Sequence, residues 1–201
     1  MRRLALLLCL ALTPGAALAE CLTADSVLSG VGFKRADGRT GRVVAKDGGI
    51  FVDYAAGKGM WTDERQTKLG IYELNTTSFF SDEELIGTGE TRQTWKFRGK
   101  PPVPEAGESW KTRISADAVT DNSSEQGYQE WSGKLDTVFA FLPAIEAKLS
   151  GCTYRAIPVE ATFLGDSGGF TRRWLYFPDL GFGLETRRDG TGIGLTALTA
   201  E

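Results

Sequence analysis

One serine in this sequence has neighbours that could make it a nucleophile. Ser167 lies within the segment Gly165-Asp166-Ser167-Gly168-Gly169. A serine hydroxyl becomes an effective nucleophile near neutral pH only when an adjacent base takes its proton. The first question is therefore whether the chain can supply such a base.

The segment resembles the stretch around the nucleophilic serine of trypsin-like proteases, and that resemblance implies a histidine as the base. The chain contains no histidine, so it lacks Ser-His-Asp and Cys-His machinery and histidine-based zinc sites. A serine–lysine pair with Lys134 or Lys148 as base stays open, although the spacing selects neither lysine. Because β-like runs at 152–164 and 169–178 flank the segment, and Gly, Asp and Ser favour turns, we interpret 165–169 as an exposed hairpin turn.

Neighbouring carboxylates offer a second kind of chemistry. Asp63 and Glu64 are adjacent, and a further acidic run occupies 82–84. A glycosidase needs two carboxylates that face each other across a cleft, one of them with a raised pKa. We interpret both runs as solvated acidic faces and keep a hydrolase as an alternative. No motif for a metal or for a phosphate-containing cofactor is present, so we expect neither catalytic residues nor a cofactor.

The N-terminus has the pattern of a secretory signal peptide. Arg2 and Arg3 precede a short apolar run at 4–12, and Ala17-Leu18-Ala19 forms an A-x-A cleavage site. We predict a signal peptide over 1–19 and a single β-rich domain over 20–201. The expected location is periplasmic or secreted, most simply the bacterial envelope.

Two cysteines would remain after removal of the signal peptide. Cys9 leaves with that peptide, whereas Cys21 and Cys152 stay in an oxidising compartment. We predict that they form a disulfide, which would stabilise the fold by roughly 4–5 kcal/mol in the chain-entropy model.

The charge balance excludes some partners. The formal net charge is −3, which gives no electrostatic reason to bind nucleic acid or anionic lipid. No later stretch is apolar enough to span a membrane as a helix, so the sequence predicts a soluble mature chain, which we expect to be a monomer.

The chain beyond 20 is organised as short β-like runs separated by turn residues. Asp-Gly pairs at 47–48 and 189–190 are hairpin signals, and 41–54 is typical of a hairpin. We expect a mainly β fold, an antiparallel sandwich, barrel or half-barrel with at most one or two short helices. The proline-rich loop at 98–109 could mark a junction between two sub-sheets.

Three segments carry specific structural expectations. Residues 67–74 favour one strand. Residues 134–151 favour two strands, with a short helix at 143–149 as the alternative. Pro158 lies inside a strand-like run, which indicates an edge position or a bulge because proline cannot donate to the ladder.

Aromatic residues alternate with polar ones in several runs. Trp95 and Phe97 share one face of their run, and Trp110 shares a face with Ile114. Aromatic side chains on strand faces usually pack in a core, but some could line a pocket for an apolar ligand. The candidate ligand face is Trp95, Phe97, Trp110 and Trp174.

The segment 151–187 resembles the closing strands of exported bacterial β-proteins, including an uncharacterised periplasmic group and, more loosely, the LolA/LolB-type lipoprotein carriers. The pattern Y-x-P-x-L-G is carried by Tyr176, Pro178, Leu180 and Gly181. The resemblance implies a half-barrel with a concave apolar face and no catalytic chemistry.

These observations support one hypothesis and two alternatives. The hypothesis is non-catalytic binding of an apolar small molecule or of an envelope protein. The alternatives are a hydrolase that uses paired carboxylates or a serine–lysine pair, and a structural subunit of an envelope complex.

Overall fold

The computed structural model describes residues 21–55, 61–82, 87–122 and 127–201. The predicted signal peptide lies outside these residues. Within them the fold is mainly β, as expected, with one short helix, α1 (Ser26–Ser29). The strands follow in chain order: β1 (Val31–Arg35), β2 (Thr40–Lys46), β3 (Gly49–Tyr54), β4 (Trp61–Lys68), β5 (Tyr72–Asp82), β6 (Gly87–Phe97), β7 (Ser109–Asn122), β8 (Tyr128–Phe141), β9 (Ile145–Leu149), β10 (Cys152–Gly165), β11 (Gly168–Phe177), β12 (Phe182–Arg188), β13 (Thr191–Gly192) and β14 (Leu195–Ala200).

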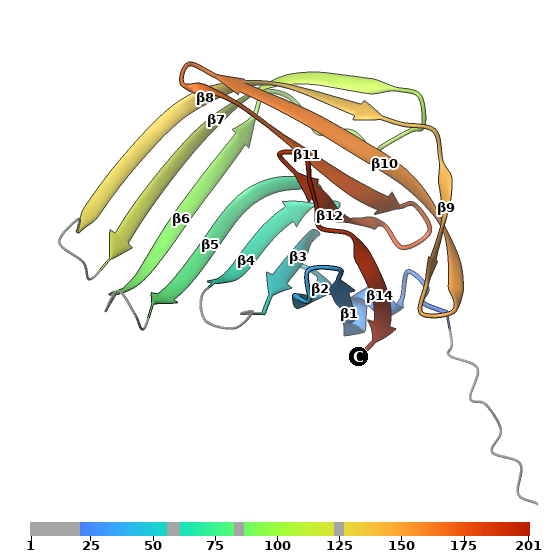
Figure 1. Ribbon diagram of the computed structural model, residues 1–201. Helices are drawn as coiled ribbons and strands as arrows, with labels where there is room; N and C mark the ends of the chain where they lie inside the picture. Colours follow the sequence, from blue (N-terminus) through green and yellow to red (C-terminus); the bar gives the residue numbers. More distant parts are fainter. Residues whose placement is uncertain (1–20, 56–60, 83–86, 123–126) are drawn as a thin grey trace, which may run out of the picture.

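The strands form one antiparallel sheet that curves into an arch (Figure 1). Its order is β13-β12-β11-β10-β8-β7-β6-β5-β4-β3-β2-β1-β14, with β9 paired to β10 beside this path. Most neighbours are consecutive in the chain, because short turns join antiparallel strands directly. In the described residues the ladder does not close into a barrel, which makes the architecture a half-barrel or sandwich. The loop at 98–108 joins β6 to β7, which pair with each other in this same sheet.

We call β1–β5 and β11–β13 the two arms of the arch. Backbone hydrogen bonds join these two arms. The Gly183 amide in β12 donates to the Leu69 carbonyl in the β4–β5 turn, at 2.8 Å. The Ala36 amide donates to the Ile193 carbonyl at 3.1 Å. The concave face therefore encloses an interior between the two arms.

The interior holds two hydrophobic clusters. One lies among β1, β2, β3, β12, β14, β9 and the first part of β10 and includes Val31, Phe33 and Phe182. At this end the structure joins Cys21 to Cys152, with a Cα–Cα distance of 5.7 Å, as the sequence predicts. The second cluster lies among the start of β5, β7, β8, β10 and β11 and includes Phe139 and Trp174.

Most of the expected strands are present. The hairpin at 41–54 is confirmed as β2 and β3. The segment 134–151 contains the end of β8 and all of β9, so the interpretation as two strands is confirmed.

The prediction of a single strand over 67–74 is wrong. The chain turns at Leu69 and Gly70, whose φ angles are 60° and 69°, and β5 begins at Tyr72. A side chain at position 70 would lie 2.2 Å from the Gly183 carbonyl oxygen, so the second arm of the arch requires glycine there. The sequence concealed this turn because leucine occupies the place where Asn or Asp commonly precedes Gly.

Pro158 lies where β10 changes partners. β10 pairs with β9 up to Ala156 and with β8 from Val159 onward. The Pro158 carbonyl accepts a hydrogen bond from the Leu142 amide at 2.9 Å, so its nitrogen faces the gap between these two ladders. The proline therefore lies at a ladder break, where no donor is needed, and the β10–β11 pairing continues through it without a bulge.

Candidate functional site

A cavity of about 970 Å³ opens on the concave face of the sheet. Its lining comes mainly from β4, β5, β6, β7, β8, β11 and β12 and from the β10–β11 turn. β4 and β5 are far in sequence from β11 and β12, so the curvature of the sheet brings these parts of the lining together. The volume is in the range of small-molecule sites in proteins.

Part of the cavity lining is apolar. We call it the apolar wall, and it consists of Trp95, Trp131, Leu135 and Phe170. The Trp131 side chain is 51% exposed, so its ring is accessible from the cavity. A Cβ at Gly133 would lie 2.6 Å from the Trp131 ring, which shows that this ring folds over the glycine two residues along β8.

The apolar wall rests on a larger aromatic cluster. We define the aromatic cluster as rings of one hydrophobic core: Tyr72, Trp95, Phe97, Trp110, Phe139, Phe163, Phe170 and Trp174. Phe163 and Phe170 stack with centroids 4.5 Å apart, and Trp95 meets Phe163 edge-on at 5.7 Å.

The four residues of the predicted ligand face all belong to this aromatic cluster. Trp95 lines the cavity. Phe97 and Trp110 are half-buried and stack on each other at 5.9 Å, and Trp174 is only 2% exposed. The structure thus gathers the four residues, but it places one at the cavity and the other three in the packing that supports it.

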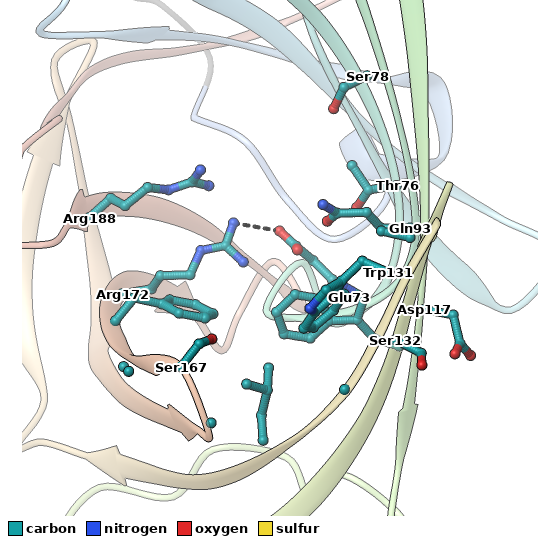
Figure 2. Close-up of a pocket in the computed structure, with 18 of the residues that line it drawn as sticks. Glu73, Thr76, Ser78, Gln93, Asp117, Trp131, Ser132, Ser167, Arg172 and Arg188 are labelled. Carbon is teal, nitrogen blue, oxygen red and sulfur yellow. Dashed lines mark hydrogen bonds and ion pairs between the residues drawn. The ribbon is translucent and has the colours of Figure 1, made fainter. Parts of the chain in front are cut away.

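The cavity also has buried charges that sequence reasoning missed. We call this set the charged cluster, and it consists of Arg65, Glu73, Arg172 and Glu185. Arg65 Nη1 donates to Glu73 Oε1 at 2.8 Å and to Glu185 Oε2 at 3.0 Å. Arg172 Nη2 donates to the same Glu73 oxygen at 2.7 Å, and its Nε donates to Glu185 Oε1 at 3.1 Å. Each arginine therefore binds both carboxylates, and Figure 2 shows Arg172 and Glu73 facing each other in the cavity.

Two further ion pairs join the charged cluster from the cavity. Asp63 Oδ2 accepts from Arg65 Nη2 at 2.9 Å. Arg188 binds Glu185 in a bidentate manner, with its Nε and Nη2 at 2.8 and 2.9 Å from the two carboxylate oxygens. Such fork-to-carboxylate geometry gives the strongest and most directional ion pairs.

Aromatic rings cover the two buried guanidiniums. Arg65 lies 4.6 Å from the centroid of the Tyr54 ring, and Arg172 lies 5.3 Å from that of Trp174. Trp174 belongs to the aromatic cluster, so the charged cluster and the aromatic cluster meet at the Arg172–Trp174 contact.

A β-bulge in β5 directs Glu73 into the interior. Gln66 pairs with Asn75 but Thr67 pairs with Glu73, so Leu74 is an extra residue in β5. The bulge shifts the alternation by one residue, and Glu73 consequently shares the concave face with Thr76.

A second bulge does the same for Glu185 in β12. Arg173 pairs with Arg187 but Trp174 pairs with Glu185, so Thr186 is the extra residue. The bulged Thr186 carbonyl accepts from the Ile193 amide at 2.8 Å and from the Gly194 amide at 3.0 Å. These bonds anchor the chain that leads to β14, so the bulge is held from outside the sheet.

The arginines keep both buried carboxylates ionised. Burial alone would raise the pKa of Glu73, but Arg172 and Arg65 hold that pKa below its ordinary value. Burial would likewise raise the pKa of Glu185, yet Arg172, the hydrogen bond from Arg188, and Arg65 hold it well below the ordinary value. Neither carboxyl can therefore serve as a general acid near neutral pH, which requires a raised pKa.

The segment 165–169, which contains Ser167, lies at the rim of this cavity. Gly165 pairs with Gly168, so Asp166 and Ser167 form the expected hairpin turn between β10 and β11. Ser167 is exposed and projects towards the cavity (Figure 2). Lys134 lines the same cavity, but in the described part of the chain no hydrogen bond joins the Ser167 hydroxyl to a lysine.

The structure describes only part of the two acidic runs considered in the sequence. Asp63 is bound to Arg65, whereas Glu64 follows it on the strand and points to the other face. Residues 83–84 lie outside the described residues. Among the residues that are described, no three Cys, Asp or Glu side chains gather in a way that could hold a metal ion.

One signal in the sequence could have revealed part of the charged cluster. Arg172 shares its alternation phase with Trp174 and Tyr176, so a charged residue occupies a position of the buried face. Glu73 and Glu185 gave no such signal, because the bulges change the phase beside them.

In the described ranges of the chain, no helix is both long enough and apolar enough to cross a bilayer. Comparison of the chain with protein-family models, with curated protein sequences and with solved structures found no match.

Proposed function

We propose that this protein binds an apolar ligand in the cavity of its concave face and catalyses no reaction on it. The observation that carries the proposal is the apolar wall within a cavity of about 970 Å³. Burial of apolar surface at roughly 25 cal/mol per Å² would supply the binding free energy. The expected resemblance to half-barrel carriers agrees with this role, and a monomer is sufficient for it.

The chemistry of the lining favours binding over catalysis. The chain has no histidine. Glu73 and Glu185 are held ionised by arginines, and each already accepts hydrogen bonds from both Arg65 and Arg172. Groups whose hydrogen bonds are already satisfied within the protein orient the lining but have no proton to transfer.

The disulfide supports an oxidising compartment for this function. Cys21 and Cys152 are 131 residues apart and join the N-terminal segment to β10. Such bonds persist in secreted and periplasmic proteins. The disulfide therefore supports a periplasmic or secreted location, and we propose the bacterial envelope.

The test uses the neutral apolar dye N-phenyl-1-naphthylamine. We expect a saturable rise in its fluorescence with a single class of sites. Trp131→Ala should weaken binding about tenfold, because it removes a large exposed ring from the apolar wall.

Tyr128→Ala is the matched control. Tyr128 lies on the same strand and is 63% exposed, but it does not line the cavity. Absence of dye binding to the unaltered protein, or equal losses in the two variants, would contradict the proposal.

A further inference from the structure

The Trp131 ring differs from the other aromatic rings of the apolar wall in what it contacts. Trp95 and Phe170 contact each other and both contact Phe163. Within the described residues, no other ring contacts Trp131. Trp131 is 51% exposed and lies in the cavity lining (Figure 2). It therefore leaves aromatic surface in the cavity for a ligand to cover.

The Trp131 ring covers Gly133, two residues along β8. Residues two apart on a strand share a face, so both belong to the concave face. Three atoms of the six-membered ring, Cζ2, Cη2 and Cε2, lie 2.6, 3.0 and 3.3 Å from the position that a Cβ at Gly133 would take. Carbon atoms in contact are about 3.5–4.0 Å apart. The ring thus occupies the space that a side chain at position 133 would need.

The backbone of β8 does not itself require glycine at this position. Gly133 pairs with Ala116 of β7 in a ladder without a register shift. Its φ angle is not among the positive ones, so other residues can adopt the same backbone conformation. Glycine inside a strand is destabilising relative to alanine, and it often marks a place where another group approaches closely. Here that group is the Trp131 ring.

We propose that Gly133 positions Trp131 as a stacking surface and that the ligand carries a planar ring that packs on the accessible part of Trp131. This inference rests on the proposed function and adds the chemical class of the ligand. Packing between rings contributes more than the buried area alone, and a linear chain does not gain that contribution. Gly133 is a positioning residue, because it acts on the ligand through Trp131.

Gly133→Ala tests the positioning. The added methyl group would overlap the Trp131 ring, so the ring must move. Tryptophan emission should therefore change, and N-phenyl-1-naphthylamine should bind about two- to tenfold more weakly, the value of one ring–ring contact. Unchanged emission or unchanged dye affinity would overturn the inference.

Gly192→Ala is the matched control. Gly192 lies in β13, is exposed, and has no positive φ angle. A Cβ there would meet no atom within 4 Å, and Gly192 does not line the cavity. The substitution should change neither the tryptophan emission nor the dye affinity.

Trp131→Leu shows whether the effect of position 133 passes through the ring. In the Trp131→Leu protein, Gly133→Ala should change neither dye affinity nor emission further, because the ring that the methyl group displaces is absent. A further loss of dye affinity would mean that Gly133 acts in another way, and it would overturn the inference.

Urea unfolding separates positioning from stability. Gly133→Ala should leave the protein equally stable or make it more stable, because the displaced ring is half exposed and alanine replaces a strand glycine. A loss of stability together with the loss of dye binding would assign Gly133 a structural role instead.

Two neutral alcohols, 4-phenyl-1-butanol and 1-decanol, test the class of ligand. Both have ten carbons and one hydroxyl, but only the first has a planar ring. Isothermal titration calorimetry measures the binding of each. Trp131→Leu keeps an apolar side chain but removes the planar ring. It should weaken 4-phenyl-1-butanol about two- to tenfold and 1-decanol less.

The outcomes separate this inference from the proposed function. Absence of dye binding to the unaltered protein contradicts the proposed function and this inference with it. Dye binding together with equal losses for the two alcohols in Trp131→Leu overturns this inference alone.

Discussion

The charged cluster and the aromatic cluster are neighbours in the same interior, yet they are built by different means. The aromatic cluster contains rings at many contact angles, from stacked to edge-on. The charged cluster depends on individual donor–acceptor pairs between 2.7 and 3.2 Å. Apolar packing tolerates substitutions that keep shape and volume, whereas a buried ion network fails when one partner is lost.

The difference also concerns what each cluster does for the cavity. The aromatic cluster contributes apolar area, which is not directional. The charged cluster connects β4 and β5 to β11 and β12 across the arch and fixes the wall that carries Thr76. Conservative substitutions in the two clusters should therefore have unequal effects.

The largest effect is expected for Glu185→Gln. The substitution keeps the shape of the side chain but removes the charge that faces Arg65, Arg172 and Arg188. Loss of one partner from a buried ion network costs about 3–5 kcal/mol. Urea unfolding followed by tryptophan fluorescence measures the free energy of unfolding.

Asp136→Asn is the control for this substitution. It weakens the exposed pair between Arg113 and Asp136, which solvent screens. We expect no measurable change in the free energy of unfolding. A similar loss in both variants would show that burial gives the charged cluster no special weight.

The next effect is the acid dependence of stability. The pKa values of Glu73 and Glu185 are depressed in the folded protein, below the ordinary value of 4.5. Their contribution is therefore fully present above the unfolded-state pKa and is lost as the pH falls through the folded values. Urea midpoints measured from about pH 7 to about pH 3 should fall at the acid end.

Glu185→Gln provides the internal reference for the pH series. One of the two depressed carboxyls is then missing, so the acid-dependent loss should be smaller than in the unaltered protein. An identical pH dependence in both proteins would show that other carboxyls cause the acid sensitivity.

Period-two alternation predicted most of the fold and one side of the site. It placed Trp95 and Phe97 on one face, and the structure confirms the strand and gathers both rings in the aromatic cluster. The residue patterns also indicated the β2–β3 hairpin and the turn at 166–167. These features depend on local patterns that the chain repeats regularly.

The charged cluster could not be predicted from these patterns. Glu73 and Glu185 face the interior because Leu74 and Thr186 are extra residues in their strands. A bulge is recognisable only from the pairing of two strands, which a single run of residues does not show. The contact of Arg65 with Glu185 further depends on curvature that brings together residues 120 apart.

A smaller effect is expected for Phe139→Leu in the aromatic cluster. Phe139 is 1% exposed and contacts Tyr72, Trp110, Phe163 and Trp174. Leucine keeps most of the apolar volume but loses the ring contacts, so unfolding should become easier by about 1–2 kcal/mol. Urea unfolding under the same conditions gives the comparison with Glu185→Gln.

The ranking of these two substitutions tests the contrast directly. If Phe139→Leu costs as much as Glu185→Gln, the two clusters respond alike to conservative change, and the contrast drawn between them is wrong.

The smallest effect on stability is expected for Ser167→Ala. Ser167 lies in the turn that joins β10, which carries Phe163 of the aromatic cluster, to β11, which carries Arg172. Ser167 is exposed, and an exposed substitution of this kind changes stability by less than about 0.5 kcal/mol. Gly168→Ala in the same turn should cost more, because the Gly168 φ angle of 127° is one that L side chains rarely adopt.

A fluorophosphonate should not label the unaltered protein, since the chain has no histidine to activate the hydroxyl of Ser167. Labelling that disappears in Ser167→Ala would instead make the turn a catalytic site and would favour the hydrolase.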